Sequence, residues 1–377
     1  MDKHLNIVAF DNPYPPTYGG VIDVYYKLKS LSEAGIKIHL HFFSKQNNEA
    51  KILQTFCEEV FIYKRKTGLF KQITINPYIV QSRNSSELKT NLNKNNFPIL
   101  FEGLHTTKLV ADDESIRKRS IIRHHNIEHD YYFGLYKSTS KTINKLYYWI
   151  ESIKLKAYLT NIKDASAHLA ISDADAKKLS SFGFNNIFTI PPFHSMDNDY
   201  VANNNHQEVP YVLYHGNLKV EENIAAVDYL LKEIFTDNSI KYVIAGSGKG
   251  HFSRSGLGDN ISIIENPSYE EITALITNAS VITLPTFQPT GIKLKLIDSL
   301  YKGQHVIVNE AMIAGFPLPD LTLLARNAEE MKSLINENLK KVFTSDDRIS
   351  RTQMLNMHFS NNQNAVKIAE ILDQLSR

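Results

Sequence analysis

The feature that most constrains the fold lies at the start of the chain: a strand, a glycine-containing turn, a helix and a second strand, in that order. The apolar run Asn6–Phe10 is followed by DNPYPPTYGG, whose prolines and glycines break regular structure. The spacing of apolar residues predicts a helix over Val21–Ala34, and IKIHLHFF alternates like a strand. This order is typical of a doubly wound parallel sheet, to which VFIY, PILF and RSIIRHH add further strands.

The same pattern restarts after a polar segment at residues 194–209, which is closed by proline and has the composition of a linker. YVLYHGN and KYVIAGSG are predicted strands that end in glycine turns, and NIAAVDYLLKEIF is a predicted helix between them. The sequence therefore predicts two Rossmann-like α/β domains, 1–193 and 210–350, that face a central cleft where ligands bind. Residues 351–377 are expected to form a helix that returns to the first domain.

Composition is typical of a globular protein and excludes several classes of function. The 377 residues are 42% hydrophobic and 22% charged, which suits two hydrophobic cores. The chain shows neither a run of about 18 apolar residues nor a secretion signal, so we expect a cytoplasmic location. A net charge of +2 argues against a nucleic-acid partner. The single cysteine, Cys57, excludes an intramolecular disulfide, while a catalytic thiol stays possible.

Basic residues are concentrated in one part of the chain. Residues 61–160 contain 17 Lys and Arg against 8 Asp and Glu. This indicates either a solvated face or a surface that meets anionic lipid headgroups or an anionic acceptor, which would make the protein peripheral on the inner face of the membrane. Within this region, residues 141–164 have helical periodicity, and core packing is the preferred interpretation over membrane contact. The side chains at that spacing are Ile143, Tyr147, Ile150 and Tyr158.

Several segments resemble a known family. YHGNLKVEENIAAVDYL, YVIAGSG and PTGIKLKLIDSLYKGQHVIVN occur in the order and at the distances found in the donor-binding domain of GT-B glycosyltransferases of the family 4 type. PYPPTYGGVIDVYYKLKSLSEAG looks like the opening loop and first helix of that family, and RHHNIEHDYY resembles a segment of some bacterial members. The resemblance covers most of the chain. It implies the GT-B fold, a nucleotide-sugar donor, and neither a metal ion nor another cofactor.

The chain departs from the commonest signature of this family. Alignment on Gly303 puts Thr290 and Asp298 where the family has two glutamates, while Asn217 and Glu222 replace an arginine and a lysine. A different family variant has a glycine turn leading to N-x-x-A and a later glycine followed by two basic residues and an acid, so that the cations lie on the later loop. The residues that match this variant are Gly216, Asn223, Ala226, Gly291, Lys293, Lys295 and Asp298.

This second arrangement has a physical rationale. A helix N-terminus with free N–H groups and nearby lysines is a suitable receptor for a diphosphate. Lys295 and Asp298 share a helix face, so one can meet phosphate while the other accepts from ribose hydroxyls. Lys293 lies outside that face, and Asn223 is more typical of a helix N-cap than of a ligand contact. Lys295 is also a catalytic candidate. The predicted donor-binding residues are Gly19, Gly20, Gly216, Asn217, Gly246, Thr290, Gly291, Lys293, Lys295 and Asp298.

The resemblance implies that the first domain holds the acceptor. Gly19 and Gly20 match a glycine loop whose N–H groups can approach phosphate or sugar. His125 matches a histidine that the family places near the transferred sugar, and Glu102 is a candidate for acceptor contact or acid–base catalysis. The sequence does not decide between His125 and its neighbour His124. Because no cysteine or aspartate stands at ligand spacing from these histidines, no metal site is expected.

The expected function is transfer of a sugar from a nucleotide-diphosphate donor to a saccharide or lipid-linked acceptor, with retention of configuration, in cell-surface glycan synthesis. The main task of such an enzyme is to stabilise the departing diphosphate. Two alternatives stay open. A non-catalytic nucleotide-sugar-binding protein would bind donor without turnover, and a GT-B epimerase would isomerise the donor without any acceptor.

Overall fold

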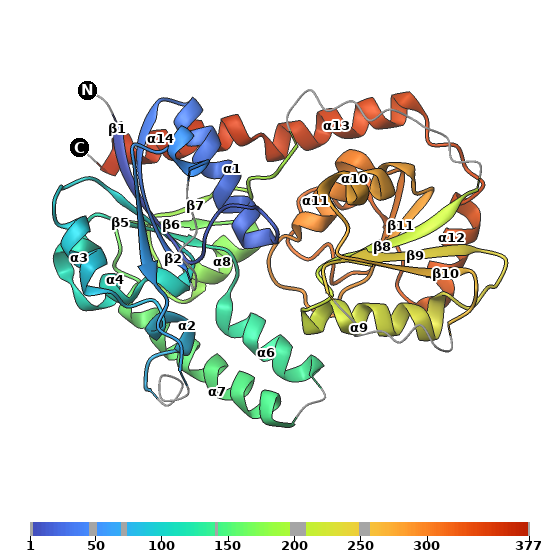
Figure 1. Ribbon diagram of the computed structural model, residues 1–377, viewed down its shortest axis with the longest axis horizontal. Helices are drawn as coiled ribbons and strands as arrows, with labels where there is room; N and C mark the ends of the chain where they lie inside the picture. The colour runs from blue at the N-terminus through green and yellow to red at the C-terminus, as the bar shows by residue number, and fades with distance from the viewer. Residues whose placement is uncertain are drawn as a thin grey trace. The chain divides into compact units, whose positions relative to one another are not determined.

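The computed structural model describes residues 3–44, 51–68, 74–139, 142–196, 209–248 and 257–375. The chain forms two compact units (Figure 1). The first unit comprises Met1–Tyr136, Ile143–Ser195 and Phe359–Arg377, and the second comprises Lys137–Thr142 and Met196–His358. The sequence analysis placed the corresponding boundaries after residues 193 and 350. Most of the predicted linker, residues 197–208, lies outside the described residues.

The first unit contains a seven-stranded parallel sheet with the order β3-β2-β1-β4-β5-β6-β7. Its central strands are buried on both faces, which explains why the segment NIVA is continuously apolar apart from Asn6. Winding reverses between β1 and β4, so the carboxyl ends of these two strands flank the topological switch point. The strands are β1 (Lys3–Ala9), β2 (Ile36–Ser44), β3 (Glu59–Lys64), β4 (Ile99–Glu102), β5 (Ser120–His124), β6 (Ala167–Ala170) and β7 (Ile187–Thr189).

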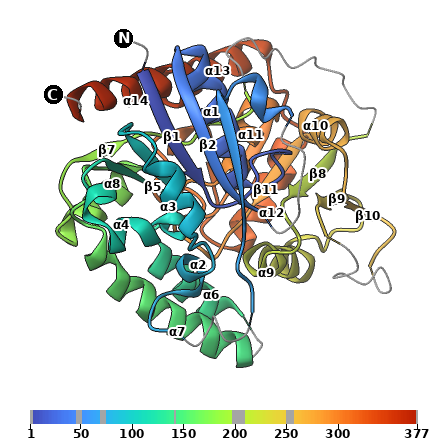
Figure 2. The same ribbon diagram turned by 60° about the vertical axis from the view of Figure 1, so that its left-hand side comes forward.

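Helices cover both faces of this sheet (Figures 1 and 2). On one face α1 and α14 pack together, with Leu28 and Ile368 in one apolar cluster with Ile7. On the other face Leu88 and Leu155 belong to a cluster that includes sheet residues. The helices are α1 (Gly19–Glu33), α2 (Tyr78–Gln81), α3 (Ser86–Leu92), α4 (Lys108–Asp112), α5 (Glu114–Arg117), α6 (Glu128–Ser138), α7 (Thr142–Tyr158), α8 (Asp173–Ser181) and α14 (Asn361–Leu375), with 3-10 turns at Leu53–Thr55, Leu104–Thr106 and Leu159–Asn161.

The second unit repeats this topology with six parallel strands in the order β10-β9-β8-β11-β12-β13. Its switch point lies between β8 and β11. The strands are β8 (Tyr211–His215), β9 (Lys241–Gly246), β10 (Ile261–Glu265), β11 (Val281–Leu284), β12 (His305–Val308) and β13 (Leu323–Leu324). The helices are α9 (Glu221–Tyr229), which continues into a π-helical turn (Leu230–Ile234), α10 (Tyr269–Asn278), α11 (Leu294–Lys302), α12 (Ala328–Asn338) and α13 (Ser345–Phe359), with a 3-10 turn at Pro319–Leu321.

The structure confirms the prediction of two doubly wound parallel sheets, and it corrects the prediction for α7. Ile143 and Ile150 were expected to pack in the core, but their side chains are 84% and 38% exposed. The cause is that α7 packs through its later residues, where Leu155 and Tyr158 are buried against the first unit. In both views α7 lies at the outer margin of this unit, beside α6 (Figures 1 and 2). None of the helices within the described ranges combines the length and the apolar character needed to cross a bilayer.

Candidate functional site

The predicted donor-binding residues of the second unit gather at the carboxyl ends of its strands. Gly216 directly follows β8, Gly246 ends β9, and residues 285–293 connect β11 to α11. This edge includes the switch point between β8 and β11, where ligands of doubly wound proteins bind. The topology therefore brings together residues that are 30 to 80 positions apart in the sequence.

Gly246 is required by the close approach of two turns. A Cβ atom at this position would lie 1.7 Å from the carbonyl oxygen of Gly216, which is backbone and cannot move aside. A Cβ atom on Gly216 would lie 3.3 Å from the side chain of Asn223. Both glycines thus allow the turns after β8 and β9 to pack closely, because neither carries a Cβ atom that would keep the two backbones apart.

Lys295 lies on the first turn of α11 and points toward the glycine turn. Its Nζ donates to Oδ1 of Asn223 at 2.7 Å and to the hydroxyl of Tyr214 at 3.3 Å. It also lies 5.0 Å from the centre of the Tyr214 ring. The amide of Asn223 in turn donates to the carbonyl of Asn217 at 3.0 Å. Lys295 is therefore connected to the Gly216–Asn217 turn through a single side chain.

The charge of Lys295 is poorly compensated. Burial lowers the pKa of its ammonium group to about 8, with Glu222 opposing this shift and Lys293 adding to it. No carboxylate bonds directly to Lys295 among the described residues; Glu222 acts on it at longer range. A buried ammonium that lacks an anionic partner favours binding of an anion. Glu222, which occupies the place of a family lysine, is itself buried and helps to keep Lys295 protonated.

The segment before α11 has the geometry of an open helix N-terminus. Gly291 adopts φ +67°, a left-handed conformation that favours glycine. Lys293 is the N-cap residue of α11 and contributes no side-chain hydrogen bond to the cap; its Nζ instead donates to the carbonyl of Thr290. The hydroxyl of Thr290 is buried without a hydrogen-bond partner in the described part of the chain. In the described part of the chain this N-terminus therefore has no side-chain cap and an unpaired hydroxyl beside it, while the N–H of Leu296 donates to the carbonyl of Lys293 at 2.9 Å.

Asp298 forms a different contact from the one that the sequence suggested. Its Oδ1 lies 2.6 Å from Nζ of Lys302, a buried lysine one turn further along α11. Beside it, Nε2 of His215 and Oγ of Ser299 are 2.7 Å apart. Burial lowers the pKa of His215 to about 4, so this ring is neutral near pH 7. Asp298 keeps a side chain that is 27% exposed and can still accept a hydrogen bond from a ribose hydroxyl.

The prediction for Asn223 was wrong. It was expected to be a helix N-cap, but the N-cap residue of α9 is Val220 and Asn223 lies inside the helix. The side chain of Asn223 is buried and links Asn217 to Lys295. The signal that could have shown this is the N-x-x-A motif itself, since its asparagine is the third residue of the helix rather than the residue before it.

In the first unit, the glycine loop packs against an aromatic side chain. Gly19 and Gly20 are the first residues of α1, and a Cβ atom on Gly20 would lie 2.7 Å from Cζ of Phe10. The Phe10 ring lies 5.1 Å from the His105 ring and 5.6 Å from the His125 ring, measured between centroids. Gly20 therefore allows Phe10 to reach the histidines that follow β4 and β5.

His125, rather than His124, stands at the carboxyl edge of this sheet. Nε2 of His125 and Oε2 of Glu102 are 2.9 Å apart, and the imidazole keeps 13% of its surface exposed. His124 is buried and contacts His168 instead. The predicted pair His125 and Glu102 is thus brought together.

Glu102 is part of a buried ion network that the sequence did not reveal. Its two oxygens lie 2.7 and 2.9 Å from Nζ of Lys27, which also contacts Asp23 at 3.1 Å. Asp23 lies 3.4 Å from Arg123 and accepts from the N–H of Phe193 at 2.6 Å. One available signal was the spacing of Asp23 and Lys27, which is i, i+4 on the helix predicted after the glycine loop.

The charges of this network fix the ionisation of the carboxyl groups. Burial alone would raise the pKa of Glu102, but Lys27 and His125 together hold it below its usual value. Burial likewise opposes ionisation of Asp23, while Arg123, Lys27 and His125 keep its pKa well below the usual range. Glu102 is therefore an ionised acceptor that orients His125, and this geometry disfavours the acid–base role that was one of its two predicted roles.

A metal ion does not suit this cluster. Ligand atoms of Asp23, Glu102 and His125 lie within 4.8 Å of one another, so the premise that no aspartate accompanies the histidines was wrong. However, the ammonium of Lys27 lies within 3.1 Å of both carboxylates and supplies the positive charge that a metal ion would bring. The absence of a metal remains a prediction, and the donor set supports it.

Burial raises the pKa values of two further titratable residues, Glu128 and Cys57. Glu128, in the segment RHHNIEHDYY, is buried on the first turn of α6, and burial raises its pKa to about 7 against the opposing charge of Arg83. It is a group able to exchange a proton near neutral pH. Cys57 lies between a 3-10 turn and β3, where burial raises the pKa of its thiol to about 12. A protonated, buried thiol does not suit nucleophilic catalysis.

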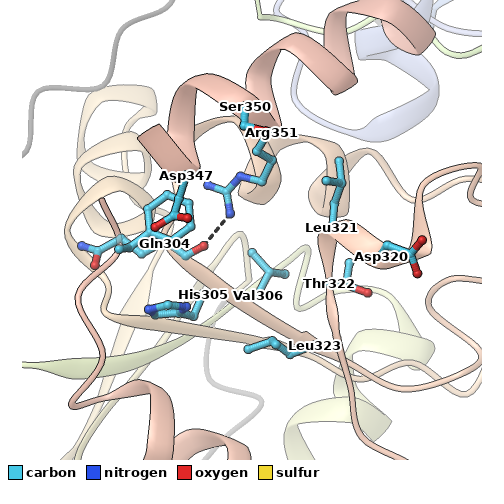
Figure 3. Close-up of a pocket in the computed structure, with 11 residues that line it drawn as sticks. Gln304, His305, Val306, Asp320, Leu321, Thr322, Leu323, Asp347, Ser350 and Arg351 are labelled. Carbon is cyan, nitrogen blue, oxygen red and sulfur yellow. Dashed lines mark hydrogen bonds between the residues drawn. The ribbon is translucent and has the colours of Figure 1, made fainter. Parts of the chain in front are cut away.

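A pocket with a volume of about 240 Å³ lies at the opposite end of the second sheet (Figure 3). It is lined by the start of β12, the segment before β13 and the beginning of α13, and contains none of the predicted site residues. Its Arg351 donates to the carbonyl of Gln304 at 2.5 Å and so helps to hold the chain that follows α11. Because it lies at the amino end of β12, this pocket is not the candidate site.

Comparison with known structures decides the fold. A glycosyltransferase from Rickettsia africae superposes with a TM-score of 0.67 and 14% sequence identity, and the alignment covers 100% of both chains. Anabaena HepE, in complex with UDP and glucose, gives a TM-score of 0.67 and 13% identity over 99% of this chain and 100% of that one. The chain has the GT-B fold. At this level of identity the likeness concerns the fold alone, and membership of family 4 remains a prediction from the motifs.

Sequence comparison adds one relative. No protein-family model matches the sequence. An uncharacterized 44.6 kDa protein in the cps region of Klebsiella pneumoniae is 26% identical over 322 residues, which cover 80% of this chain and 81% of the relative.

Proposed function

We propose that the protein is a glycosyltransferase that moves a sugar from a nucleotide-diphosphate donor to a saccharide or lipid-linked acceptor, with retention of configuration. The second unit would bind the donor, and the first would hold the acceptor. The Klebsiella relative from the cps region supports a role in cell-surface glycan synthesis. We place the enzyme in the cytoplasm, where it would act at the inner face of the membrane. HepE, with which the chain shares its fold, was crystallised with UDP and glucose.

The observation that carries the proposal is the position of Lys295. Its ammonium, on a partly buried side chain, lies at the topological switch point, on the first turn of a helix whose N-terminus has no side-chain cap among the described residues. A diphosphate supplies the anion that this ammonium lacks. The helix N-terminus adds N–H donors and a favourable dipole to the same place. Lys293 can reinforce this charge once it leaves the carbonyl of Thr290.

The chemistry then needs no covalent bond between protein and sugar. The bond between the anomeric carbon and the diphosphate oxygen breaks, and its electron pair leaves with the diphosphate. The acceptor hydroxyl forms the new bond to the anomeric carbon and releases its proton to the departing phosphate or to a base. Lys295 and the start of α11 stabilise the charge that develops on the diphosphate. We assign to His125 a hydrogen bond to the sugar or acceptor, with Glu102 orienting its ring.

A thermal-shift panel of UDP-, GDP- and ADP-linked sugars tests donor binding. A ligand at 100 times its dissociation constant stabilises the folded state by about 2.7 kcal/mol, which is readily detected. We expect one nucleotide class to stabilise the wild type and to lose most of this effect in Lys295→Ala. Lys232→Ala, which removes a lysine of the same unit whose side chain is 82% exposed, is the matched control. No shift with any nucleotide sugar, or equal shifts in both variants, would contradict the proposal.

Turnover assays then separate the proposed function from its two alternatives. The stabilising nucleotide sugar, labelled in the sugar, is incubated with and without a membrane and glycan extract. Transfer of label to the extract supports a glycosyltransferase. Binding without turnover in any extract would indicate a nucleotide-sugar-binding protein, and conversion of the donor to an isomer without extract would indicate an epimerase.

A further inference from the structure

Helix α7 presents an apolar row to solvent. Five large apolar side chains occur at intervals of three or four residues, with one adjacent pair, so they share one side of the helix. Their exposed fractions range from 38% to 84%, which is unusual for a helix that is otherwise packed on a core. The row consists of Ile143, Leu146, Trp149, Ile150 and Ile153.

The opposite side of α7 is fixed to the first unit, so this row cannot turn inward. Leu155 and Tyr158 are buried in the core, and the hydroxyl of Tyr158 donates to the carbonyl of Thr107 at 3.0 Å. The carboxylate of Glu151 accepts from the N–H of Tyr78 at 2.7 Å and from Lys154 at 2.9 Å. The helix is therefore held in one orientation, with its apolar row outward at the margin of the unit (Figures 1 and 2).

The exposed charged residues of α7 are all of one sign. Glu151 is the only acidic residue of α7, and it is 1% exposed and engaged in the two bonds above. The exposed charged residues of the helix are Lys145 and Lys156. At 3.6 residues per turn, these two lysines lie along one flank, and Trp149 falls between them and the isoleucines. An apolar stripe, then tryptophan, then lysine is the order found in helices that lie in the headgroup region of a bilayer.

We propose that α7 is a membrane-docking helix that lies in the plane of an anionic lipid surface, with its apolar row among the acyl chains and its lysines at the headgroups. The basic stretch at 61–160 adds a favourable long-range charge. The inference is independent of the proposed glycosyltransferase activity, because it uses none of the donor-site or acceptor-site residues. None of the described helices can cross a membrane. Docking through α7 would therefore be the way in which the protein reaches a lipid-linked substrate.

A second copy of this chain is a less suitable occupant. The spacing of the row would also fit a helix pair, but pairing two α7 helices would bring Lys145 and Lys156 of one copy near those of the other. No exposed carboxylate of α7 is present to neutralise them. Like charges across such an interface oppose association, whereas anionic lipids attract them.

The single tryptophan of the chain makes the proposal directly testable, since Trp149 reports on α7 alone. We expect the fluorescence of the full-length protein to shift to shorter wavelength on addition of phosphatidylglycerol vesicles, and not on addition of phosphatidylcholine vesicles. Brominated lipids should quench it. The shift should weaken with rising salt, because the lysine contribution is screened. A Trp149 spectrum that does not change with phosphatidylglycerol at low ionic strength would overturn the proposal.

Variants separate the row from general surface properties. Leu146→Glu together with Ile153→Glu should weaken vesicle co-sedimentation about tenfold or more, because two side chains proposed to enter the acyl chains become charged. Val366→Glu, at a position 51% exposed on α14, is the matched control and should bind like the wild type. Lys145→Gln with Lys156→Gln should lose the preference for anionic lipid while keeping the apolar row. Equal binding of the row variant and the control would overturn the proposal, as would a lipid-free dimer that the row variant converts to a monomer.

Discussion

The ammonium of Lys295 lies 2.7 Å from Oδ1 of Asn223, and this contact joins α11, the helix after β11, to α9, the helix after β8. The same asparagine holds the carbonyl of Asn217 at 3.0 Å. An anion that enters at the switch point can therefore meet a lysine that is already positioned and whose hydrogen bonds go to two neutral acceptors, Asn223 and Tyr214. The affinity for the donor should therefore depend on Lys295 more than on the exposed lysines of the second unit.

Lys295→Ala should weaken the binding of the nucleoside diphosphate by about 1.5 to 3 kcal/mol, which is roughly a tenfold to 150-fold higher Kd. The reason is that a charge-assisted bond to phosphate is lost and the remaining N–H donors do not replace its charge. Isothermal titration with the nucleotide identified by the thermal-shift panel measures the change. Lys232→Ala should leave the Kd unchanged. An unchanged Kd in Lys295→Ala would remove this residue from the donor site.

Donor binding should also depend on pH in a defined direction. Burial lowers the pKa of Lys295 to about 8 in the free protein, and diphosphate binds the protonated form. Affinity should therefore be constant between pH 6.5 and 7.5 and fall above about pH 8, with proton uptake on binding in that range. The stability of the free protein should change with pH in the opposite direction. The pKa of Lys295 is about 8 in the folded state and 10.5 in the unfolded chain, so the unfolded chain binds more protons between these two pH values. The contribution of Lys295 to the free energy of unfolding therefore rises with pH in that range.

Calorimetry in two buffers of different ionisation enthalpy measures the proton uptake. Lys295→Arg keeps its charge throughout this range and should flatten the pH dependence. A steep fall above pH 8 that persists in Lys295→Arg would show that another group is responsible.

The sequence predicted the strands and the glycine turns well, because each depends on a local pattern. The apolar run of β1, the alternation of β2 and the turns at Gly216 and Gly246 are examples. The resemblance placed Asn223 and Lys295 in one motif variant, but Asn223 was expected to be a helix N-cap, and its bond to Lys295 was not predicted. That contact joins residues 72 positions apart and depends on the order of the strands.

The ion network of the first unit could not be predicted for a different reason. Asp23 and Lys27 lie on a helix, Glu102 ends β4, and Arg123 lies within β5. All four side chains are buried, so they break the rule that charges face solvent. Hydrophobic periodicity therefore gives no sign of them, and only their mutual proximity makes the burial of their charges possible.

The pair formed by Lys27 and Glu102 should be strongly coupled in stability. Glu102→Gln or Lys27→Met leaves a buried charge without its main partner and should lower the free energy of unfolding by about 3 to 5 kcal/mol. The double variant should lose less than the sum of the two, since no unpaired charge of this pair remains. Urea unfolding of the four proteins measures the coupling. Lys118→Met, in an exposed pair with Glu114, should cause no measurable change. Additive single effects would contradict a direct interaction.

This effect of Glu102 should depend on pH. Its pKa is lowered on folding, so its contribution to stability is fully present above the unfolded value of about 4.3 and is lost as the pH falls through the folded value. The difference in stability between the wild type and Glu102→Gln should therefore be constant from pH 5 to 7 and narrow below about pH 4. A difference that stays constant to pH 3 would show that folding does not lower the pKa of Glu102.

His125→Ala should lower turnover more than donor affinity. The imidazole is the member of the network that keeps an exposed surface, and its removal leaves the contact between Lys27 and Glu102 intact. We expect kcat to fall by about 100-fold or more, as for loss of a positioned hydrogen-bonding or proton-transfer group, while the Kd for the donor changes by less than about threefold. Label-transfer kinetics and calorimetry on the same preparation measure the two quantities. His124→Ala, which removes a buried ring that contacts His168, should affect stability rather than the ratio of kcat to donor affinity. A large rise in Kd with unchanged kcat in His125→Ala would instead place this histidine in donor binding alone.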